Sequence, residues 1–341
     1  MRLDGKRVLV TGGTGSLGQT VVRRLLTGEI GQPERITVFS RDEAKQNDMR
    51  IGYLKRPAAT DDVIYENSKR ALSFRIGDVR DYDALAQAVG EADVVIHAAA
   101  LKQVPSCEYF PAEAVKTNIE GPMNLVRAVT RARDAVELVV GISTDKACKP
   151  VNVMGMTKAI MERILIEANL ETDRTRFCAV RYGNVIASRG SVVPLFLEQI
   201  KHGGPITITT ADMTRFLLTL DRAVDTVFAA IADARRGETF IPRAPSARIT
   251  DLADVLIDGR DIPVHVTGIR PGEKTHEILV SEEECHRTIQ RGDYYAILPI
   301  LPELREGDYT PALTGEYSSA DAVVDREALR ALVSGHLRSD F

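Results

Sequence analysis

Short apolar runs alternate with amphipathic stretches along the first half of the chain, which indicates strands separated by helices. Six runs rich in β-branched residues predict strands at Arg7–Thr11, Ile36–Ser40, Ser73–Ile76, Val94–Ala98, Leu138–Ser143 and Cys178–Tyr182. Apolar positions at helical spacing predict helices at Gln19–Leu26, Tyr82–Val89, Pro122–Arg133 and Met154–Ala168. Continuous apolar strands between helices are typical of a parallel sheet covered on both faces, so we expect a doubly wound, Rossmann-like α/β fold of six or seven strands.

The pattern changes after Tyr182, where loops become rich in Gly and Pro ("SRGSVVP", "HGGPITITT", "GIRPGEK") and the elements between them become shorter. We therefore expect a dinucleotide-binding domain over residues 1–182, with a returning segment near 213–243. A smaller domain over 183–300 is expected to pack against the open strand ends. Residues 301–341 form a Pro-rich tail with a possible helix at Asp325–Leu337.

Composition excludes several classes of protein. The chain has 341 residues, of which 44% are hydrophobic, enough for a sizeable core in one or two domains. A net charge of −4 provides no basic field for nucleic acid or an anionic membrane. No apolar run approaches the ~20 residues of a membrane span, and a strand begins almost at the amino terminus without a signal peptide, so we expect a cytoplasmic protein. The four cysteines lack metal-site spacing, so we expect reduced thiols and no bound metal.

A glycine-rich turn lies between the first predicted strand and helix, in "VLVTGGTGSLGQT". Glycines in this context allow a tight turn and a close approach of a pyrophosphate to the N–H groups at a helix start. The turn therefore predicts a dinucleotide site, whose candidate contacts are Gly12, Thr14, Gly15, Ser16, Leu17 and Gly18.

The end of the second strand distinguishes NADP from NAD. NAD sites usually carry an acidic residue there to hold the ribose hydroxyls. In "VFSRDEAKQ" the position holds Ser40 and Arg41, with Lys45 one turn later, which suits a 2′-phosphate; Asp42 is the opposing feature. The sequence thus favours NADP, and further candidate contacts are Asp78 and Val79 in "GDVRD" near the adenine and Ala98, Ala100 and Lys102 in "HAAALKQ" near the nicotinamide.

The stretch "STDKACKPVNVMGMTK" resembles the catalytic segment of a short-chain dehydrogenase/reductase. In that superfamily a tyrosine normally stands four residues before the lysine, which here is Lys158. The tyrosine position holds Met154, whose thioether cannot take a proton. The chain therefore is either inactive or carries its proton chemistry elsewhere.

A wider set of motifs resembles one group within the extended short-chain dehydrogenase/reductases. "TGGTGSLG", "SRDEAKQ", "GDVRD", "HAAALKQVPSCEYFPAEAVKTNI", "STDKA", "RYGNVIASRGSVVPLF", "MTRF" and "GIRPGEK" occur in order over about Lys6 to Leu279. Together they are similar to UDP-N-acetylglucosamine 4,6-dehydratases that invert carbon 5, and "NVMGMTK" is similar to the capsule-type branch. The resemblance implies NADP, a UDP-N-acetylglucosamine substrate, a role in polysaccharide or glycan biosynthesis, and a homo-oligomer, hexamer or tetramer.

The resemblance also implies roles for the residues after the fifth strand. Asp145 would be the acid for the carbon 6 hydroxyl and Lys146 the base for the carbon 5 proton, while Lys158 would hold the nicotinamide ribose. A lysine base must be neutral part of the time, so we expect burial, the nicotinamide and Lys158 to lower the pKa of Lys146, with Asp145 opposing. Thr144 would relay the carbon 4 proton toward Lys158 or Lys146, and the sequence does not choose between these routes.

The nucleotide-sugar side is expected on the second domain. Arginines suit a diphosphate because their guanidinium meets phosphate oxygens in pairs. The candidate contacts are Asn184, Val192, Thr209, Arg215, Arg270 and Glu273, with Lys102 shared with the cofactor. Cys107 and Met154 are each open between simple packing and contact with the site.

Two other readings remain open. The chain could be a retaining 4,6-dehydratase or a 4-epimerase, although epimerases lack the acid–base pair and retaining enzymes carry a carboxylate at the position of Lys146. It could also be a non-catalytic NADP sensor, which Met154 suggests but which does not explain Asp145, Lys146, Arg215 and Arg270 together.

Overall fold

The computed structural model describes residues 1–54, 70–132, 136–186, 192–269 and 271–337. Within these ranges, the main sheet has the strand order β14-β15-β10-β6-β5-β4-β1-β2-β3. The seven strands from β10 to β3 run parallel, and β14 and β15 add an antiparallel hairpin at one edge. The strands are β1 Arg7–Thr11, β2 Arg35–Ser40, β3 Leu72–Ile76, β4 Val94–His97, β5 Leu138–Thr144, β6 Arg176–Tyr182, β10 Thr239–Pro242, β14 Thr288–Arg291 and β15 Tyr294–Ile297. The expected doubly wound parallel sheet is confirmed.

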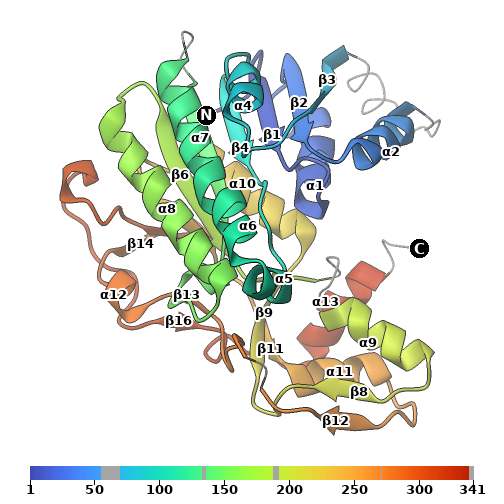
Figure 1. The fold of residues 1–341 in the computed structure, drawn as a ribbon. Coiled ribbons are helices and arrows are strands. Elements are labelled where there is room, and N and C mark those ends of the chain that lie inside the picture. The colour runs from blue at the N-terminus through green and yellow to red at the C-terminus, as the bar shows by residue number, and fades with distance from the viewer. Residues whose placement is uncertain (55–69, 133–135, 187–191, 270, 338–341) are drawn as a thin grey trace.

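Helices cover both faces of this sheet (Figure 1). The helices of this part are α1 Ser16–Leu26, α2 Glu43–Leu54, α4 Tyr82–Val89, α5 Val104–Tyr109, α6 Pro111–Val115, α7 Gly121–Arg131, α8 Val153–Glu171 and α10 Leu220–Asp233. Side chains alternate along each strand, so Val8 and Val10 join the core under α1 and α10 while Leu9 joins the core under α4, α7 and α8. Both faces are thus apolar, which explains the continuous hydrophobic runs in the sequence.

A smaller part of the molecule lies beyond the carboxyl ends of the parallel strands (Figure 1). Its elements are β7 Asn184–Val185, α9 Val192–Lys201, β8 Ile206–Ile208, β9 Thr214–Leu218, β11 Ser246–Arg248, α11 Ile249–Ile257, β12 Val264–Val266, β13 Ile278–Val280, α12 Glu282–Cys285, β16 Tyr317–Ser318 and α13 Arg326–Leu337. A 3₁₀ turn, Pro302–Leu304, lies instead at the amino ends of the strands, beside Gly237. A separate core joins α9, α11 and α13 to β8, through buried residues such as Phe196, Leu252 and Leu329. This arrangement places the loops after β1, β4, β5 and β6 opposite the smaller part.

Two features of the fold differ from the expected elements. The hairpin β14–β15 falls within the expected smaller domain, but β15 pairs with β10 of the main sheet, because the outer edge of β10 offers unpaired backbone groups. The helices α2, α5 and α6 have no expected counterpart, and the expected helix end at Arg133 lies outside the described residues. The domain limits at 182 and 300 remain a proposal.

Among the described helices, none combines the length and the apolar character that a membrane crossing requires.

Candidate active site

The glycine-rich turn after β1 fits a dinucleotide pyrophosphate. Gly12 has a φ of +65°, and a Cβ atom there would lie 2.7 Å from the backbone nitrogen of Ala99. At Gly18 a Cβ atom would lie 2.5 Å from the Cα of Gly13. Gly15 precedes α1 and has no side chain to cap it, so the first N–H groups of this helix are left for an anion. Thr14, Ser16 and Leu17 lie between these glycines, as the sequence places them.

The end of β2 carries the groups expected near a 2′-phosphate. The hydroxyls of Ser40 and Thr14 lie 2.8 Å apart, and the Arg41 guanidinium lies 3.7 Å from the Asp78 carboxylate. Asp42 pairs with Lys45 at 2.6 Å and also accepts the backbone N–H of Lys45 at 3.0 Å. The carboxylate that counted against NADP is therefore engaged at the start of α2, which leaves the arginine as the exposed group at this strand end.

The nicotinamide side is bounded by the loop after β4, which carries Ala98, Ala100 and Lys102. Asn118 holds this loop, because it accepts the Leu101 N–H at 2.8 Å and donates to the Leu101 carbonyl at 3.0 Å. Asn118 also donates to Thr157 of α8 at 3.0 Å and lies in a π-helical turn, Lys116–Glu120. π turns are frequent at functional sites. The sequence analysis missed Asn118, although it stands in the quoted "AVKTNI" motif.

Thr144, Asp145 and Lys146 lie together where β5 ends in a 3₁₀ turn, Asp145–Ala147. The Thr144 hydroxyl donates to Asp145 Oδ1 at 2.8 Å, and the Lys146 Nζ donates to the same oxygen at 3.1 Å. Lys146 Nζ also donates to Asn184 Oδ1 at 3.2 Å, so a residue expected to face the sugar nucleotide meets the catalytic turn. Asp145 is fully buried, whereas the Lys146 side chain is 22% exposed, so the lysine is the member of the pair that solvent and ligands can reach.

Glu277 is a member of this cluster that the sequence analysis missed. Its Oε1 lies 3.2 Å from Lys146 Nζ and 3.8 Å from Arg215 Nε, and only 3% of its side chain is exposed. Glu277 is the last residue of "GEKTHE", a stretch that overlaps the quoted "GIRPGEK" and extends it by three residues. A tertiary contact with Lys146 has no local sequence signal, since the two residues come from different parts of the fold.

The charges of the cluster shift its pKa values in different directions. Burial raises the pKa of Asp145, with Glu277 adding to the rise and Lys146 opposing it. Glu277 is also penalised by burial, but Lys146, Arg215 and Lys274 outweigh this and lower its pKa. For Lys146, burial is outweighed by the carboxylates of Asp145 and Glu277, so its pKa is raised. The expectation of a lowered pKa for Lys146 is therefore wrong for the protein alone, because Glu277 adds a second negative charge.

The first turn of α8 is packed directly on the catalytic turn. Asn152 caps the helix by accepting the Gly155 N–H at 2.8 Å. A Cβ atom at Gly155 would lie 2.1 Å from the Lys146 carbonyl oxygen, so only glycine allows this approach. The glycine of "NVMGMTK" is thus required sterically, because it lets α8 approach the backbone of Lys146 closely.

Met154 and Cys107 lie in the same small apolar cluster. Both are buried, together with Ala114, and Leu101 and Val104 pack around them. Burial raises the pKa of the Cys107 thiol. These observations favour packing for both side chains, and contact with a ligand stays a prediction.

Lys158 lies one turn after Met154 on α8 and is buried. Its Nζ lies 2.9 Å from the sulfur of Met161. Burial lowers the pKa of Lys158 to about 8, against the opposing charge of Glu162. His97, at the end of β4, is also fully buried, and burial together with Lys158 lowers its pKa to about 3, so it is neutral. A lysine that is partly neutral near pH 8 can exchange protons with a neighbouring hydroxyl.

The expected nucleotide-sugar residues are placed in two groups. Thr209 donates to Glu273 Oε2 at 3.3 Å, so these two lie together, and Val192 begins α9. Arg215 is buried on β9 and donates to the backbone carbonyls of Thr214 and Thr275 at 2.7 and 3.1 Å. It therefore ties β9 to the segment before Glu277, and its role as a diphosphate contact stays a prediction. Arg270 lies outside the described residues.

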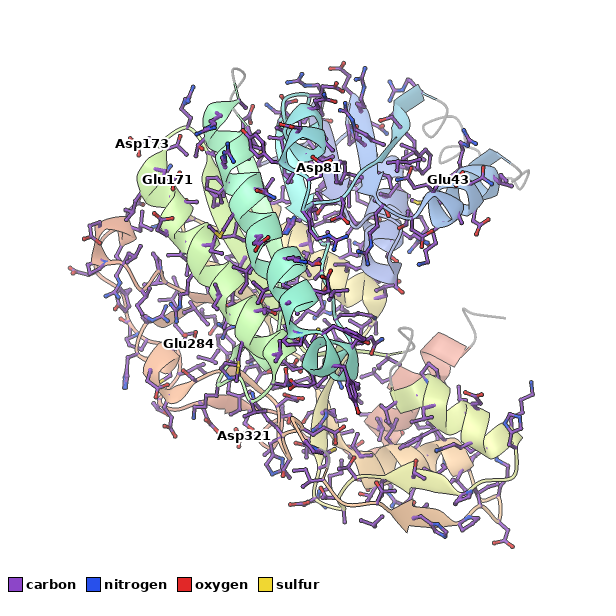
Figure 2. All side chains as sticks on the ribbon, in the orientation of Figure 1. Glu43, Asp81, Glu171, Asp173, Glu284 and Asp321 are labelled. Carbon is purple, nitrogen blue, oxygen red and sulfur yellow. The ribbon has the colours of Figure 1, made fainter. Side chains whose placement is uncertain are left out.

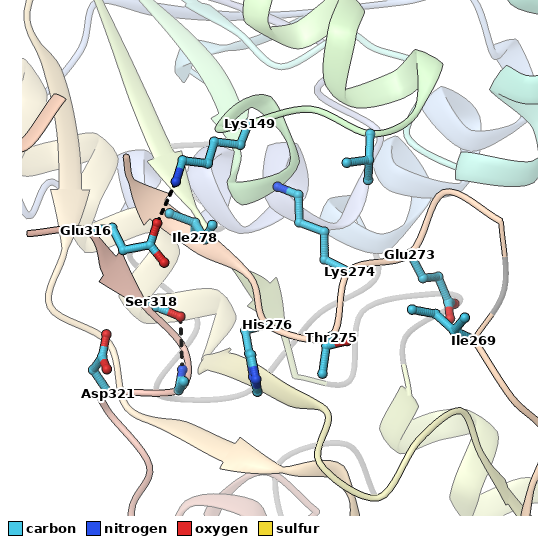
Figure 3. A pocket seen from close by; sticks show the side chains of 12 residues that line it. Lys149, Ile269, Glu273, Lys274, Thr275, His276, Ile278, Glu316, Ser318 and Asp321 are labelled. Atoms are coloured by element: carbon cyan, nitrogen blue, oxygen red, sulfur yellow. Dashed lines mark hydrogen bonds and ion pairs between the residues drawn. The ribbon is translucent and has the colours of Figure 1, made fainter. Parts of the chain in front are cut away.

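A cavity of about 620 Å³ opens beside the same segment (Figure 3). Its wall includes Glu273 and Lys274, and Lys149 pairs with Glu316 across it at 2.8 Å. The Lys274 amine donates to the Cys148 carbonyl at 2.5 Å, which holds the segment to the loop after the catalytic turn. The loop and the segment that carries Glu277 are thus joined on this side as well.

A buried ionic network supports the site from behind. Arg181 on β6 donates to Glu162 of α8 at 2.6 Å and to Glu284 of α12 at 2.7 Å, and Figure 2 labels Glu284 in this position. The Arg181 side chain is 3% exposed. Both carboxylates are thereby neutralised away from water. The four cysteines are buried free thiols, and no group of residues with metal-ligand geometry occurs in the part of the chain that the structure describes.

Fold and site together define a class: a dinucleotide-binding α/β protein of the short-chain dehydrogenase/reductase type with an added smaller part. Residues 8–299 match the family described as polysaccharide biosynthesis protein, and the chain belongs to this family.

Relatives and solved structures agree with this placement. A protein of Rickettsia canadensis named UDP-glucose 4-epimerase is 42% identical over 92% of this chain and 91% of its own length. The structure of Pen from Bacillus thuringiensis has a TM-score of 0.87 at 34% identity, covering 99% of both chains. DesIV, a dTDP-glucose 4,6-dehydratase of Streptomyces venezuelae solved with NAD bound, has a TM-score of 0.66 at 21% identity, covering 79% of this chain and 86% of that one. This last likeness concerns the fold alone.

Proposed function

We propose that this protein is an NADP-dependent UDP-N-acetylglucosamine 4,6-dehydratase that inverts carbon 5 and serves polysaccharide or glycan biosynthesis. The observation that carries the proposal is the contact between the buried Asp145 and the partly exposed Lys146 at the end of β5, beside Thr144. Loss of water from a sugar needs an acid at the leaving hydroxyl and a base at the adjacent carbon. This pair supplies both, and a structural turn would not require burying the carboxylate.

The chain's own residues divide the chemistry as follows. A bound NADP supplies a hydride acceptor for sugar carbon 4 and a hydride donor for carbon 6, with no net redox change. Burial and the charge of Glu277 raise the pKa of Asp145, which favours the protonated acid that the departing carbon 6 hydroxyl needs. Lys146 takes the carbon 5 proton in its neutral form. Its raised pKa makes that form scarce near neutral pH, and the form becomes more abundant as the pH rises. Dehydration is therefore expected to increase with pH on the acid side of its optimum.

The missing tyrosine leaves the carbon 4 proton to another group. The Thr144 hydroxyl donates a hydrogen bond to Asp145. Lys158 is buried, and burial lowers its pKa to about 8. Lys158 is thus the better acceptor of the two lysines for the carbon 4 proton, since burial lowers its pKa whereas Asp145 and Glu277 raise the pKa of Lys146. A relay from Thr144 toward Lys158 lets the site work without a phenol.

Support for NADP comes from the end of β2. Arg41 and Ser40 offer a cation and a hydroxyl, and Asp42 is occupied by Lys45. The glycine turn and α1 would hold the pyrophosphate. An unpaired acidic residue at this strand end would instead have favoured NAD.

A second candidate function is a UDP-sugar 4-epimerase. The observation that favours it is the name of the 42% identical Rickettsia protein. Epimerisation needs only reversible oxidation at carbon 4, so the Asp145–Lys146 pair would have no task in it. The dehydratase is preferred for that reason.

The protein is also proposed to be a cytoplasmic homo-oligomer, hexamer or tetramer. Several large apolar side chains of the helical layer stand exposed, namely Tyr109, Phe110, Met123, Met156 and Ile160. Tyr109 ends α5 and Phe110 follows it, Met123 lies on α7, and Met156 and Ile160 lie on α8, which packs against both α5 and α7; exposed apolar groups of this size commonly mark an interface.

Incubation with UDP-N-acetylglucosamine and NADP in heavy water, followed by NMR of the product, tests the proposal. We expect a 4-keto-6-deoxy sugar with deuterium at carbon 5 and the L-arabino configuration. Retained configuration would indicate a retaining dehydratase, and UDP-N-acetylgalactosamine without loss of water would indicate an epimerase. No conversion of any UDP-sugar would favour a sensor.

A further inference from the structure

Glu277 places a second carboxylate at the catalytic turn from a distant part of the chain. Its Oε1 lies 3.2 Å from Lys146 Nζ, close to the 3.1 Å that separates this nitrogen from Asp145. Lys146 is thus held between two carboxylates, only one of which belongs to the motif after β5. Such an arrangement restricts both where the amine lies and when it is charged.

The backbone at Glu277 is anchored independently of its carboxylate. The Glu277 N–H donates to Ser319 Oγ at 2.9 Å, and the Ser319 N–H donates to the Glu277 carbonyl at 2.8 Å. Ser319 is fully buried and shares a hydrogen bond with Thr214 of β9 at 2.7 Å. The fold of this segment therefore does not need the carboxylate as an attachment.

The carboxylate serves Lys146 more directly than it serves Arg215. Arg215 Nε is the more distant partner at 3.8 Å, and its terminal nitrogens donate to the carbonyls of Thr214, Lys274 and Thr275. Glu277 Oε2 has no hydrogen-bond partner among the described residues although it is buried. A buried oxygen without a hydrogen-bond partner destabilises the folded state. Such groups are uncommon and often have a functional role.

We propose that Glu277 is a positioning residue that holds the Lys146 amine beside Asp145 and sets the pH range in which Lys146 acts as a base. This inference rests on the proposed dehydratase function for its consequence in catalysis. It does not depend on that function for the charge state of Lys146, which can be measured without turnover.

The charged groups around Lys146 determine the sign of the expected effect. Asp145 and Glu277 raise its pKa, Arg215 lowers it, and Asn184 contributes a neutral oxygen. Lys274, whose own pKa burial lowers, interacts with Lys146 from the same segment as Glu277. Removing the Glu277 charge therefore lowers the pKa of Lys146. The same change lowers the pKa of Asp145, which the negative charge of Glu277 raises.

The test is Glu277→Gln, which keeps the shape and an acceptor for Lys146 but removes the charge. Competitive acetylation with acetic anhydride across pH, read on the peptide that contains Lys146, reports when the amine is neutral. We expect the midpoint to fall by about 1 to 2 pH units, the usual effect of one adjacent charge. Glu137→Gln is the matched control, because Glu137 pairs with Lys6 near the amino ends of the strands, and it should leave the midpoint unchanged.

Turnover supplies a second readout. With UDP-N-acetylglucosamine, both limbs of the pH–rate profile of Glu277→Gln should move toward acid pH, whereas a merely structural loss would lower the rate without moving them. A folded Glu277→Gln protein with an unmoved acetylation midpoint would overturn the inference. If the midpoint falls but wild-type protein dehydrates no UDP-sugar, the inference stands and the proposed function fails.

Glu277→Asp keeps the test decisive if the glutamine variant does not fold. The shorter side chain draws the charge away from the amine, so the midpoint should fall by a smaller amount in the same direction. An unchanged midpoint in this folded variant would equally contradict the inference.

Discussion

Asp145 and Glu277 are two buried carboxylates whose pKa values move in opposite directions, although Lys146 contacts both. Burial raises the pKa of Asp145, whereas Lys146, Arg215 and Lys274 outweigh burial at Glu277 and lower its pKa. Environments that separate two pKa values commonly assign acid and base roles. At the scale of residues, this supports Asp145 as the proton donor to carbon 6. Met154 has a thioether that neither donates nor accepts a proton in this reaction, so it takes no part in proton transfer.

Substitutions at Met154 test that last point. Met154→Leu conserves volume and apolarity in the cluster with Cys107 and Ala114, so we expect a loss in kcat of no more than a few-fold. Met154→Tyr restores the residue usual in the superfamily but buries a phenol among apolar groups, and should gain little. Steady-state kinetics check both variants. A large rise in kcat for the tyrosine variant would mean that the protein is an impaired enzyme rather than one with a different relay.

Arg41 should read the 2′-phosphate of NADP. Arg41→Ala removes a charge-assisted contact that contributes about 1.5–3 kcal/mol, so NADP affinity should fall by about 10- to 100-fold while NAD affinity stays constant. Calorimetric titration with both dinucleotides measures this. Arg35→Ala, at the other end of β2, is the control and should change neither affinity. An equal loss for NAD and NADP would show that Arg41 does not recognise the phosphate.

At the scale of elements, the position of α8 against the catalytic turn depends on one glycine. In Gly155→Ala the new Cβ would overlap the Lys146 carbonyl, so α8 and the turn must separate. We expect a stability loss of about 1–3 kcal/mol and a marked fall in kcat. Gly52→Ala is the matched control, because Gly52 lies in α2 with open space around it, and it should be neutral or slightly stabilising. Denaturant unfolding compares the two, and equal effects would contradict this role of Gly155.

The elements themselves were largely predictable from sequence, whereas their contacts were not. The periodicity of Tyr82–Val89 and the glycines after β1 predicted a helix and a turn that the structure contains, because both signals are local. The pairing of the hairpin β14–β15 with the edge of β10 was not foreseen, since joining that edge depends on tertiary contacts. The contact of Glu277 with Lys146 was missed for the same reason, and with it the sign of the pKa shift of Lys146.

At the scale of the whole molecule, Arg181 connects the main sheet to the smaller part. It joins β6 to α8 through Glu162 and to α12 through Glu284, and its guanidinium also donates to the Leu279 carbonyl at 2.8 Å. Removing it would leave two carboxylates buried without a counter-charge. Arg181 therefore links the sheet, the helix that carries Lys158 and the segment near Leu279 through one buried side chain.

Arg181→Leu should destabilise the protein by about 3–5 kcal/mol, the usual result of breaking a buried ion pair. Glu316→Gln is the comparison, since it breaks a partly exposed pair with Lys149 that should contribute less than about 1 kcal/mol. Thermal unfolding of both variants measures the difference. Similar losses for the two variants would contradict a central role for the Arg181 network.

The claim that Lys146 removes the carbon 5 proton is tested most directly by UDP-N-acetylglucosamine labelled with deuterium at that carbon. Wild-type protein should release the label to solvent during turnover. In Lys146→Ala the release should slow by the ~10²–10⁴-fold typical of a lost acid–base group, while NADPH absorbance shows that oxidation at carbon 4 continues. The control is Lys6→Ala, because Lys6 lies directly before β1 at the amino ends of the strands, far from the catalytic turn; this variant should release label at the wild-type rate. Undiminished release by Lys146→Ala would contradict the account.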